Sequence, residues 1–474
     1  MTRTDRSRRP ASKRTFLQRA RAFLQSDRSK FAALLLLVAS VFAMGGGSRA
    51  DIQSLIVLRP LAFMLAAYAL LVIQPGELRA VSRPLILLGL LAALALVQLF
   101  PMPPAVWTAL PGRELFVAIA KDAGVPVGYR PMTLSPARTL NMLLSLCVPL
   151  AAILVFAIQN DAGRRRIAPV VLSAGLVSAL VAVAQLAGVG GGSLYLYRVT
   201  NPDFPVGLFA NRNHQALLMA ITLVLLGELA RRGSLARQQR PLVTAGLAVA
   251  ALVVIALTLV SGSRAGLLLM VIALASAAVL VVRAAPRRNE RDKRGKGRVW
   301  LLAAVGGGVL TIVAAMIVFS RAESIERLYA NDALDDYRIQ RLPILLDMMR
   351  DHWAAGIGFG TFEGVYRHYE TVDALTPFIF NQAHNDWLQF PMEGGVPALV
   401  LLAAAIAMVA GRGAKVIAET LRGRSREDLA WLATLVLIAV ASIVDYPLRT
   451  PIVMLIATFA FTALIRRQEP DAFE

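Results

Sequence analysis

The chain has 474 residues, of which 57% are hydrophobic, and its 50 Lys and Arg outnumber 30 Asp and Glu, giving a formal net charge of +20. This apolar content exceeds what a soluble domain needs, and the apolar residues fall into runs long enough to cross a bilayer. Most basic residues gather in short loops between those runs, as the positive-inside rule requires. The composition therefore excludes a soluble nucleic-acid-binding protein and indicates an integral membrane protein with no nucleic-acid partner.

Apolar windows of roughly 17 to 22 residues give about twelve candidate spans. Each span must be helical, because lipid offers the backbone no hydrogen-bond partners. The predicted fold is therefore an all-α polytopic membrane protein. The spans lie near residues 31–47, 54–74, 84–100, 140–158, 167–187, 213–230, 241–260, 265–282, 299–319, 385–410, 430–444 and 449–465.

When these spans cross the membrane in sequence order, every short basic loop falls on the same side as the two termini. Both termini are therefore expected in the cytoplasm. No convincing cleavage site follows the basic tail, and the first helix is expected to be retained. The predicted parts are a basic tail at 1–30, an N-terminal bundle at 31–200, a second transmembrane domain at 201–466 and a short tail at 467–474.

Two loops on the far side, at 101–139 and 320–384, exceed what a helix connection needs, and loops of this length usually carry function. The larger one lies between the ninth and tenth spans. Its histidines His352 and His368 have no recognisable partner and are expected on the surface.

No cofactor or metal site is predicted. The single cysteine, Cys147, excludes an intramolecular disulfide and a thiolate metal site. The acidic pair Asp335 and Asp336 is too weak a signal for a metal. The glycines of GIGFG at 356–360 follow no strand and precede no Lys-Ser or Lys-Thr, so we interpret them as a turn and not a phosphate loop.

Four segments, in order and on the same side of the membrane, resemble signatures of the O-antigen ligase superfamily. They are VGLFANRNHQALLMA at 206–220, SGSRAG at 261–266, the stretch at 338–362 ending in GIGFGTF, and AHNDWLQFPMEGGVPALV at 383–400. Members of this superfamily ligate O-antigen to lipid A core, polymerise O-antigen or exopolysaccharide repeat units, or glycosylate protein hydroxyls. The resemblance implies metal-independent transfer from an undecaprenyl-diphosphate-linked glycan, on the periplasmic face of the bacterial inner membrane.

A polyprenyl diphosphate leaving group develops negative charge, and arginine binds phosphate oxygens bidentately. Arg264 follows SGS at the start of the eighth span, where it is either a phosphate ligand or an interfacial anchor. Arg338 matches the family pattern, although Leu342 replaces the tryptophan usual four residues later, so Arg341 is an alternative phosphate ligand. Either loop arginine could instead be a solvated charge.

His384 lies at the predicted start of the tenth span, where the helix dipole favours a neutral ring that can accept the proton of an acceptor hydroxyl. The alternative to a catalytic role is that His384 only hydrogen-bonds the loop to Asn385 or Asp386. Asn385 is also a candidate substrate ligand. Four residues at the outer start of the sixth span either contact the substrate or cap and anchor the helix, namely Asn211, Arg212, Asn213 and His214.

These residues predict a single displacement in which Arg264 and Arg338 hold the diphosphate and His384 activates the acceptor. Ligation to lipid A core is slightly favoured over polymerisation of repeat units, whose acceptor is a second glycan. A multi-span secondary transporter is the alternative from another class. It lacks support here because no half-to-half repeat is visible and the polar segments gather at the outer face.

Overall fold

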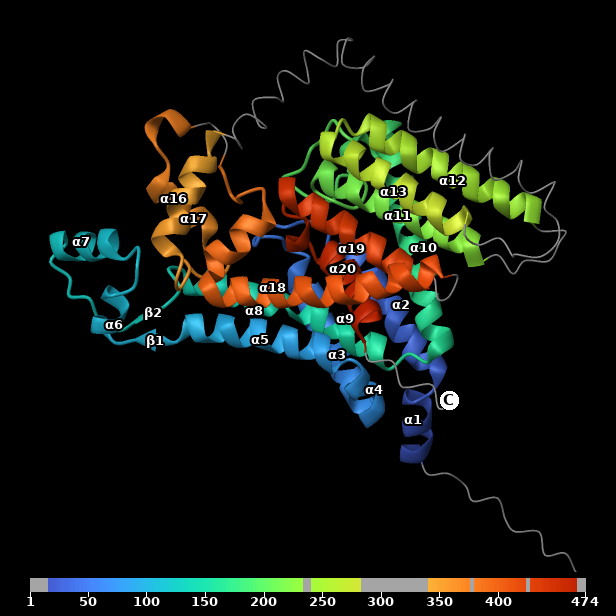
Figure 1. Ribbon diagram of the computed structural model, residues 1–474, viewed down its shortest axis with the longest axis horizontal. Coiled ribbons are helices and arrows are strands. Elements are labelled where there is room, and N and C mark those ends of the chain that lie inside the picture. The colour runs from blue at the N-terminus through green and yellow to red at the C-terminus, as the bar shows by residue number, and fades with distance from the viewer. Residues whose placement is uncertain (1–15, 233–239, 283–339, 376–378, 423–426, 467–474) are drawn as a thin grey trace, which may run out of the picture.

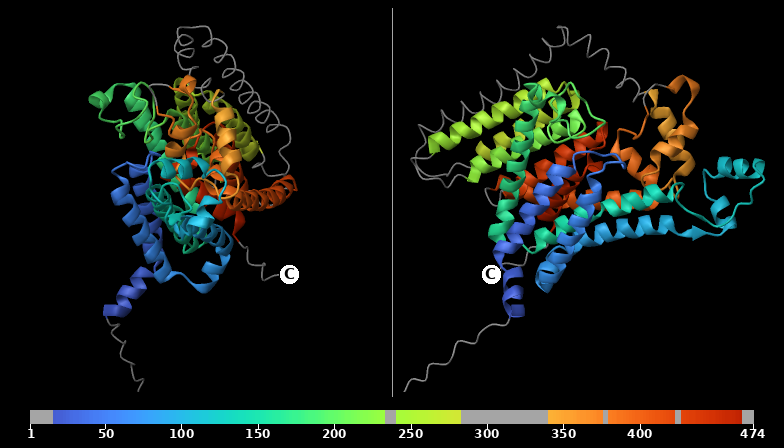
Figure 2. Two further views of the ribbon diagram at one scale, coloured as in Figure 1. Left: turned by 90° about the vertical axis from the view of Figure 1, so that its left-hand side faces the viewer. Right: turned by 180° about the vertical axis from the view of Figure 1, so that it is seen from behind.

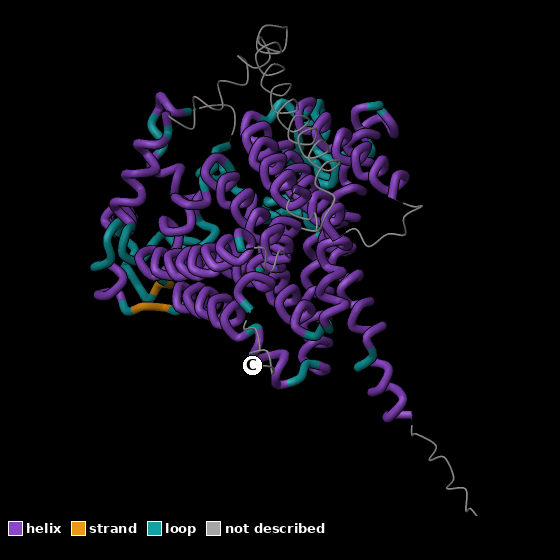
Figure 3. Tube along the Cα trace, turned by 45° about the vertical axis from the view of Figure 1, so that its right-hand side comes forward, coloured by secondary structure: helices purple, strands orange, loops and turns teal. Residues whose placement is uncertain are grey.

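The computed structural model describes residues 16–232, 240–282, 340–375, 379–422 and 427–466. Helices make up nearly all of its regular structure, and the short strands β1 and β2 form one antiparallel pair (Figure 3). The expected all-α class is confirmed. The predicted span at 299–319, Arg338, Asp335 and Asp336 lie outside the described residues.

The first half of the chain runs through helices α1 to α10 (Figure 1). Its elements are α1 Phe16–Leu24, α2 Asp27–Met44, α3 Leu55–Val72, α4 Pro75–Ala80, α5 Ser82–Leu99, β1 Pro101–Met102, α6 Pro104–Thr108, α7 Glu114–Asp122, β2 Arg130–Pro131, α8 Pro136–Ser145, α9 Cys147–Ala157 and α10 Asp161–Leu186.

The second half begins with the 3-10 turn η1 and ends in α20. Its elements are η1 Val189–Gly192, α11 Arg212–Arg232, α12 Arg240–Val260, α13 Arg264–Val282, α16 Leu342–His352, α17 Phe362–Tyr369, η2 Val372–Ala374, α18 Asp386–Leu421, α19 Glu427–Val444, η3 Pro447–Arg449 and α20 Pro451–Ile465.

Eight helical segments in the described part are long and apolar enough to cross a membrane, and α19 and α20 are shorter apolar helices. This supports the polytopic fold, whereas the number of spans stays a prediction. Burial separates the core from the periphery, because 83% of the α11 span is buried but only 17% of the α12 span is. An apolar surface left exposed by the protein suits contact with lipid.

Small residues let α11 and α13 approach closely. A Cβ built on Gly266 of α13 would lie 2.5 Å from Cβ of Ala216, and one on Gly227 of α11 would lie 2.9 Å from Ala277. Contacts of this kind are a common basis for helix association in membranes. They fix the starts of α11 and α13, where Arg212 and Arg264 lie, relative to each other.

The glycine turn at 356–360 docks on a kink in α18, at Gly395 (φ 64°). The amide of Gly358 donates to the carbonyl oxygen of Glu393 (2.9 Å), and the amide of Val396 donates to Ala354 (3.2 Å). Gln98 of α5 hydrogen-bonds both α18 and the glycine turn, because its side chain donates to the carbonyl oxygen of Glu393 and accepts from the amide of Phe359, each at 3.0 Å. The turn therefore anchors α16 and α17 beside the start of α18.

The elements α16 and α17 rise at the upper left of Figure 1, far from α1 at the bottom, and the reverse view in Figure 2 agrees. Five segments far apart in the sequence are the linkers α2–α3, α10–α11, α12–α13 and α19–α20 and the segment before α18. Parts of all five line one cavity.

Candidate active site

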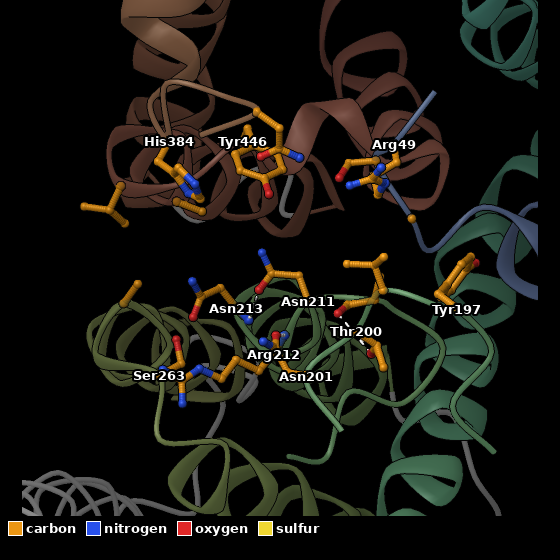
Figure 4. Close-up of a pocket in the computed structure, with 18 of the residues that line it drawn as sticks. Arg49, Tyr197, Thr200, Asn201, Asn211, Arg212, Asn213, Ser263, His384 and Tyr446 are labelled. Atoms are coloured by element: carbon orange, nitrogen blue, oxygen red, sulfur yellow. Dashed lines mark hydrogen bonds between the residues drawn. The ribbon is translucent and has the colours of Figure 1, made fainter. Parts of the chain in front are cut away.

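The cavity has a volume of about 1340 Å³ and lies among these five chain segments. Pockets for one drug-sized ligand measure roughly 300 to 1,000 Å³, so this space suits two substrates or one large one. In Figure 4, His384 and Tyr446 face Asn213, Arg212 and Ser263 across the opening. Residues from distant parts of the sequence thus meet at one site.

The charged residues of the cavity wall are mostly arginines. Arg49, Arg198, Arg212 and Arg264 all line it, and Asp51 is the only carboxylate among its described lining residues. Four guanidinium groups against one carboxylate make the wall strongly cationic when His384 is neutral. Such a wall favours an anionic ligand with phosphate or carboxylate oxygens.

The SGSRAG segment forms a tight turn that starts α13. Gly262 has φ +60°, a conformation that glycine adopts without strain. The hydroxyl of Ser263 accepts from the amide of Gly266 (2.9 Å), and Ser261 donates to the carbonyl of Thr258 (2.7 Å). These bonds explain why the motif needs its serines and glycine, and they fix the position from which Arg264 enters the cavity.

Arg212 begins α11 on the opposite side of this turn. Its guanidinium lies 4.2 Å from the ring centroid of Phe204, and its backbone amide donates to Asn201 Oδ1 (3.1 Å). A cation stacked on an aromatic face keeps its orientation while its edges can still donate hydrogen bonds. Arg212 is therefore held in the wall next to the SGSRAG turn, with Nη1 3.5 Å from a Cβ built on Gly262.

His384 has an unusual backbone. It is the only described non-glycine residue with positive φ, at +51°, a conformation that costs free energy and gathers at functional sites. Asn385 accepts from the amide of Leu388 (3.1 Å) and so caps α18. The His384 ring lies between Phe380 and Tyr446, with centroid distances of 5.5 and 4.8 Å.

Asp445, buried at the end of α19, connects the polar residues of the site. Its Oδ2 accepts from Asn211 Nδ2 (3.2 Å) and Asn213 Nδ2 (2.9 Å), and its Oδ1 accepts from the amide of Tyr446 (2.9 Å). His384 Nδ1 is 3.5 Å from Oδ1. The carboxylate thus holds one edge of the His384 ring, while 22% of that side chain stays exposed.

The structure places most predicted site residues in the cavity wall, namely Asn211, Arg212, Asn213, Arg264, His384 and Asn385. His214 lies behind the wall, with Nε2 3.8 Å from Asp445 Oδ2 and its ring against Phe209 and Tyr446. The roles of the predicted site residues toward substrate stay predictions.

Arg341 is also outside the wall. It is 4% exposed, donates to the carbonyl of Ala374 (2.8 Å) and lies 3.7 Å from Glu370. Its guanidinium stacks over Phe380 at 4.5 Å, and Phe380 in turn contacts His384. In this arrangement Arg341 supports the ring that packs on His384.

Sequence reasoning did not select Asp445, although a signal existed. An acidic residue directly after the apolar run 430–444 is costly near lipid and points to function. It also missed Arg49, Asp51 and Arg198, which lie in linkers without a recognisable pattern.

A buried ionic group lies beneath the site. Arg449 is 3.2 Å from Glu393 Oε2 and 3.4 Å from Asp386 Oδ1, and Asp386 Oδ2 accepts from the amide of Leu448 (3.3 Å). The group ties the start of α18, which carries His384, to η3, which follows Asp445. It therefore fixes the histidine relative to its carboxylate.

The predicted surface position of His352 is wrong, because the residue is 1% exposed. Its Nε2 is 3.1 Å from the Tyr369 hydroxyl, and its ring packs so closely on Gly112 that a Cβ there would lie 2.3 Å away. Burial, assisted by the charge of Arg113, lowers the pKa of His352 to about 4. His368 is exposed, as expected.

Among the described residues, no group of three or more His, Cys, Asp or Glu side chains could hold a metal ion. The site is built from arginines, amides and a histidine–carboxylate pair. These groups can bind an anion and accept a proton.

Fold and site together define a polytopic membrane protein with a cavity for an anionic ligand beside a potential general base. Residues 248–403 match the family model described as O-antigen ligase, which confirms the predicted resemblance to the O-antigen ligase superfamily. The matched region includes Arg264 and His384, whereas Arg212 and Asp445 lie outside it. A search of curated proteins found no match for the chain.

Proposed function

We propose that this chain transfers a glycan from an undecaprenyl-diphosphate carrier to a hydroxyl acceptor on the periplasmic face of the bacterial inner membrane. The family match supports a membrane glycosyltransferase of the O-antigen ligase or polymerase type, and favours an enzyme over a secondary transporter. The observation that carries the proposal is the meeting of Arg212, Arg264 and His384 in one cavity, with the buried Asp445 behind His384.

His384 is the general base in this proposal. Because Nδ1 faces Asp445, the ring carries its proton on Nδ1 and offers the Nε2 lone pair to the acceptor. As the acceptor oxygen forms its bond to the anomeric carbon, its proton moves to Nε2. Asp445 stabilises the imidazolium that results.

The arginines receive the leaving group. The bond between the anomeric carbon and the diphosphate breaks with its electron pair on the phosphate oxygen, and Arg264, Arg212 and Arg338 neutralise the charge. Attack opposite the leaving group inverts the anomeric centre. Arginines supply the positive charge that a divalent cation supplies in other transferases, so transfer proceeds without metal.

The orientation in this proposal is the one that the basic loops predict, with both termini in the cytoplasm. The linkers that line the cavity would then reach the periplasm. Apolar lining residues beside Arg264 and His384 include Leu268 and Ile443, which are 57% and 54% exposed. An isoprenyl chain in the outer leaflet could enter there with its diphosphate against Arg264.

The acceptor we favour is the lipid A core, and a lipopolysaccharide gel tests this choice. A host lacking the gene should show loss of the whole O-antigen ladder with accumulation of lipid-linked glycan, and wild type should restore it while His384→Ala should not. Collapse to core plus one repeat would instead identify a repeat-unit polymerase. An unchanged ladder would contradict both.

A further inference from the structure

One part of the cavity has no role in the displacement described above. It is lined by residues of the α2–α3 linker and of the segment before α11. We call this part the Arg49 end and define it by Arg49, Asp51 and Arg198. In Figure 4, Arg49 and Tyr197 lie on the side away from His384 and Ser263. The cavity thus has cations at two separate places.

Arg49 and Asp51 form a hydrogen-bonded pair, and the exposed Arg198 lies next to it. Arg49 donates to Asp51 through Nε (3.0 Å) and Nη2 (3.2 Å), and Arg198 Nη2 lies 4.0 Å from the same carboxylate. Hydrogen bonding from Arg49 holds the pKa of Asp51 below its usual range, so the carboxylate is ionised. Two guanidinium groups sharing one carboxylate leave an excess of one positive charge.

The backbone that carries these residues is well anchored. The amide of Gly46 donates to the Tyr197 hydroxyl (2.6 Å), and its carbonyl accepts from the amide of Ala210 (3.1 Å). A Cβ on Gly46 would lie 1.8 Å from the carbonyl oxygen of Leu208, so only glycine fits this close approach. The two linkers are therefore joined, and Arg49 and Arg198 keep a defined separation.

The direction of attack indicates that the acceptor, and not the donor, binds at the Arg49 end. In a displacement with inversion, the leaving diphosphate and the attacking hydroxyl lie on opposite faces of the anomeric carbon. With the diphosphate at Arg264 and the isoprenyl chain beside Leu268, the acceptor enters from the other end of the cavity. The volume of about 1340 Å³ leaves room for both substrates at once.

We propose that Arg49, held by Asp51, and the neighbouring exposed Arg198 form an acceptor subsite that binds an anionic group, phosphate or carboxylate, on the acceptor saccharide. The inference rests on the proposed glycosyl transfer. Guanidinium groups bind both kinds of oxyanion bidentately, so the subsite selects for negative charge on the part of the acceptor that extends from the attacking hydroxyl at His384 toward the Arg49 end.

The test uses the full-length protein in lipid nanodiscs with a polyprenyl-diphosphate-linked glycan donor. Matched lipid-anchored saccharide acceptors carry a phosphate monoester, a carboxylate or a hydroxyl at the same position. The double variant Arg49→Gln/Arg198→Gln should raise KM for both anionic acceptors about tenfold and leave kcat, donor KM and the neutral acceptor unchanged. Arg350→Gln, which removes an exposed arginine that does not line the cavity, should change nothing.

Each outcome has one meaning. Wild type that does not distinguish the three acceptors, or a double variant that changes all three KM values equally, would overturn the subsite. A rise in donor KM in the double variant would overturn the assignment to the acceptor. No transfer by wild type with any acceptor would refute the proposed function itself, which separates the two failures.

Discussion

Replacing Asp445 with asparagine should slow transfer and leave donor binding nearly intact. The substitution conserves shape but removes the charge that faces His384 Nδ1 at 3.5 Å. A hydrogen bond to a charged group contributes about 1.5 to 3 kcal/mol. If that contribution is realised only as the imidazolium forms, kcat should fall about 10- to 150-fold, with donor KM within about threefold.

The assay is single-turnover transfer by purified protein, combined with a double-mutant cycle with His384→Ala. Because Asp445 acts through His384, Asp445→Asn should cost little more once the histidine is absent. Thermal unfolding of each variant serves as the control, since Asn211 and Asn213 also donate to this carboxylate. Additive losses in the cycle would refute the reasoning, because they would show that Asp445 acts independently of the base.

Three further predictions concern the surroundings of the site. Arg449→Met leaves the carboxylates of Glu393 and Asp386 buried without their cation, so it should lower the free energy of unfolding by about 3 to 5 kcal/mol in denaturant titrations. Adding Glu393→Gln should recover part of this loss, and an unchanged midpoint of denaturation in Arg449→Met would contradict the account. His352 is neutral in the fold, with a pKa of about 4 against 6.5 when unfolded, so the contact between the two long loops should be fully stable above about pH 6.5 and weaken as the pH falls toward 4. Hydrogen exchange in residues 342–375 measures this, and His352→Phe should abolish the pH dependence. Chelation of divalent cations should leave transfer unchanged, and recovery of a lost activity by added Mg²⁺ or Mn²⁺ would contradict the assignment of charge neutralisation to the arginines.

The meeting of distant motifs could be predicted from the sequence because a chain that repeatedly crosses a bilayer returns every second linker to the same side. That rule predicts Arg212, Arg264 and His384 on one side of the membrane without any knowledge of packing. Hydropathy also locates the helices, since each must satisfy its own backbone in lipid.

The side on which a linker emerges does not determine which way its side chains point. Arg341 lies close to His384 in the fold but stacks on Phe380 outside the cavity wall. Asp445 gains its importance from its contacts with Asn211 and Asn213, which the packing of α19 on α11 creates. The burial of His352 likewise depends on Gly112 in the other long loop, and no local pattern reports that contact.

The most direct test is transfer by the purified protein in nanodiscs, from an undecaprenyl-diphosphate-linked glycan to a lipid A core acceptor. Wild type, His384→Ala and Arg264→Gln would be compared, with the product followed by mass spectrometry. The account predicts covalent transfer with inversion by wild type, a fall of about 10²-fold or more without His384, and a similar loss without Arg264. Full transfer by His384→Ala would contradict the assignment of the base and with it the proposed mechanism.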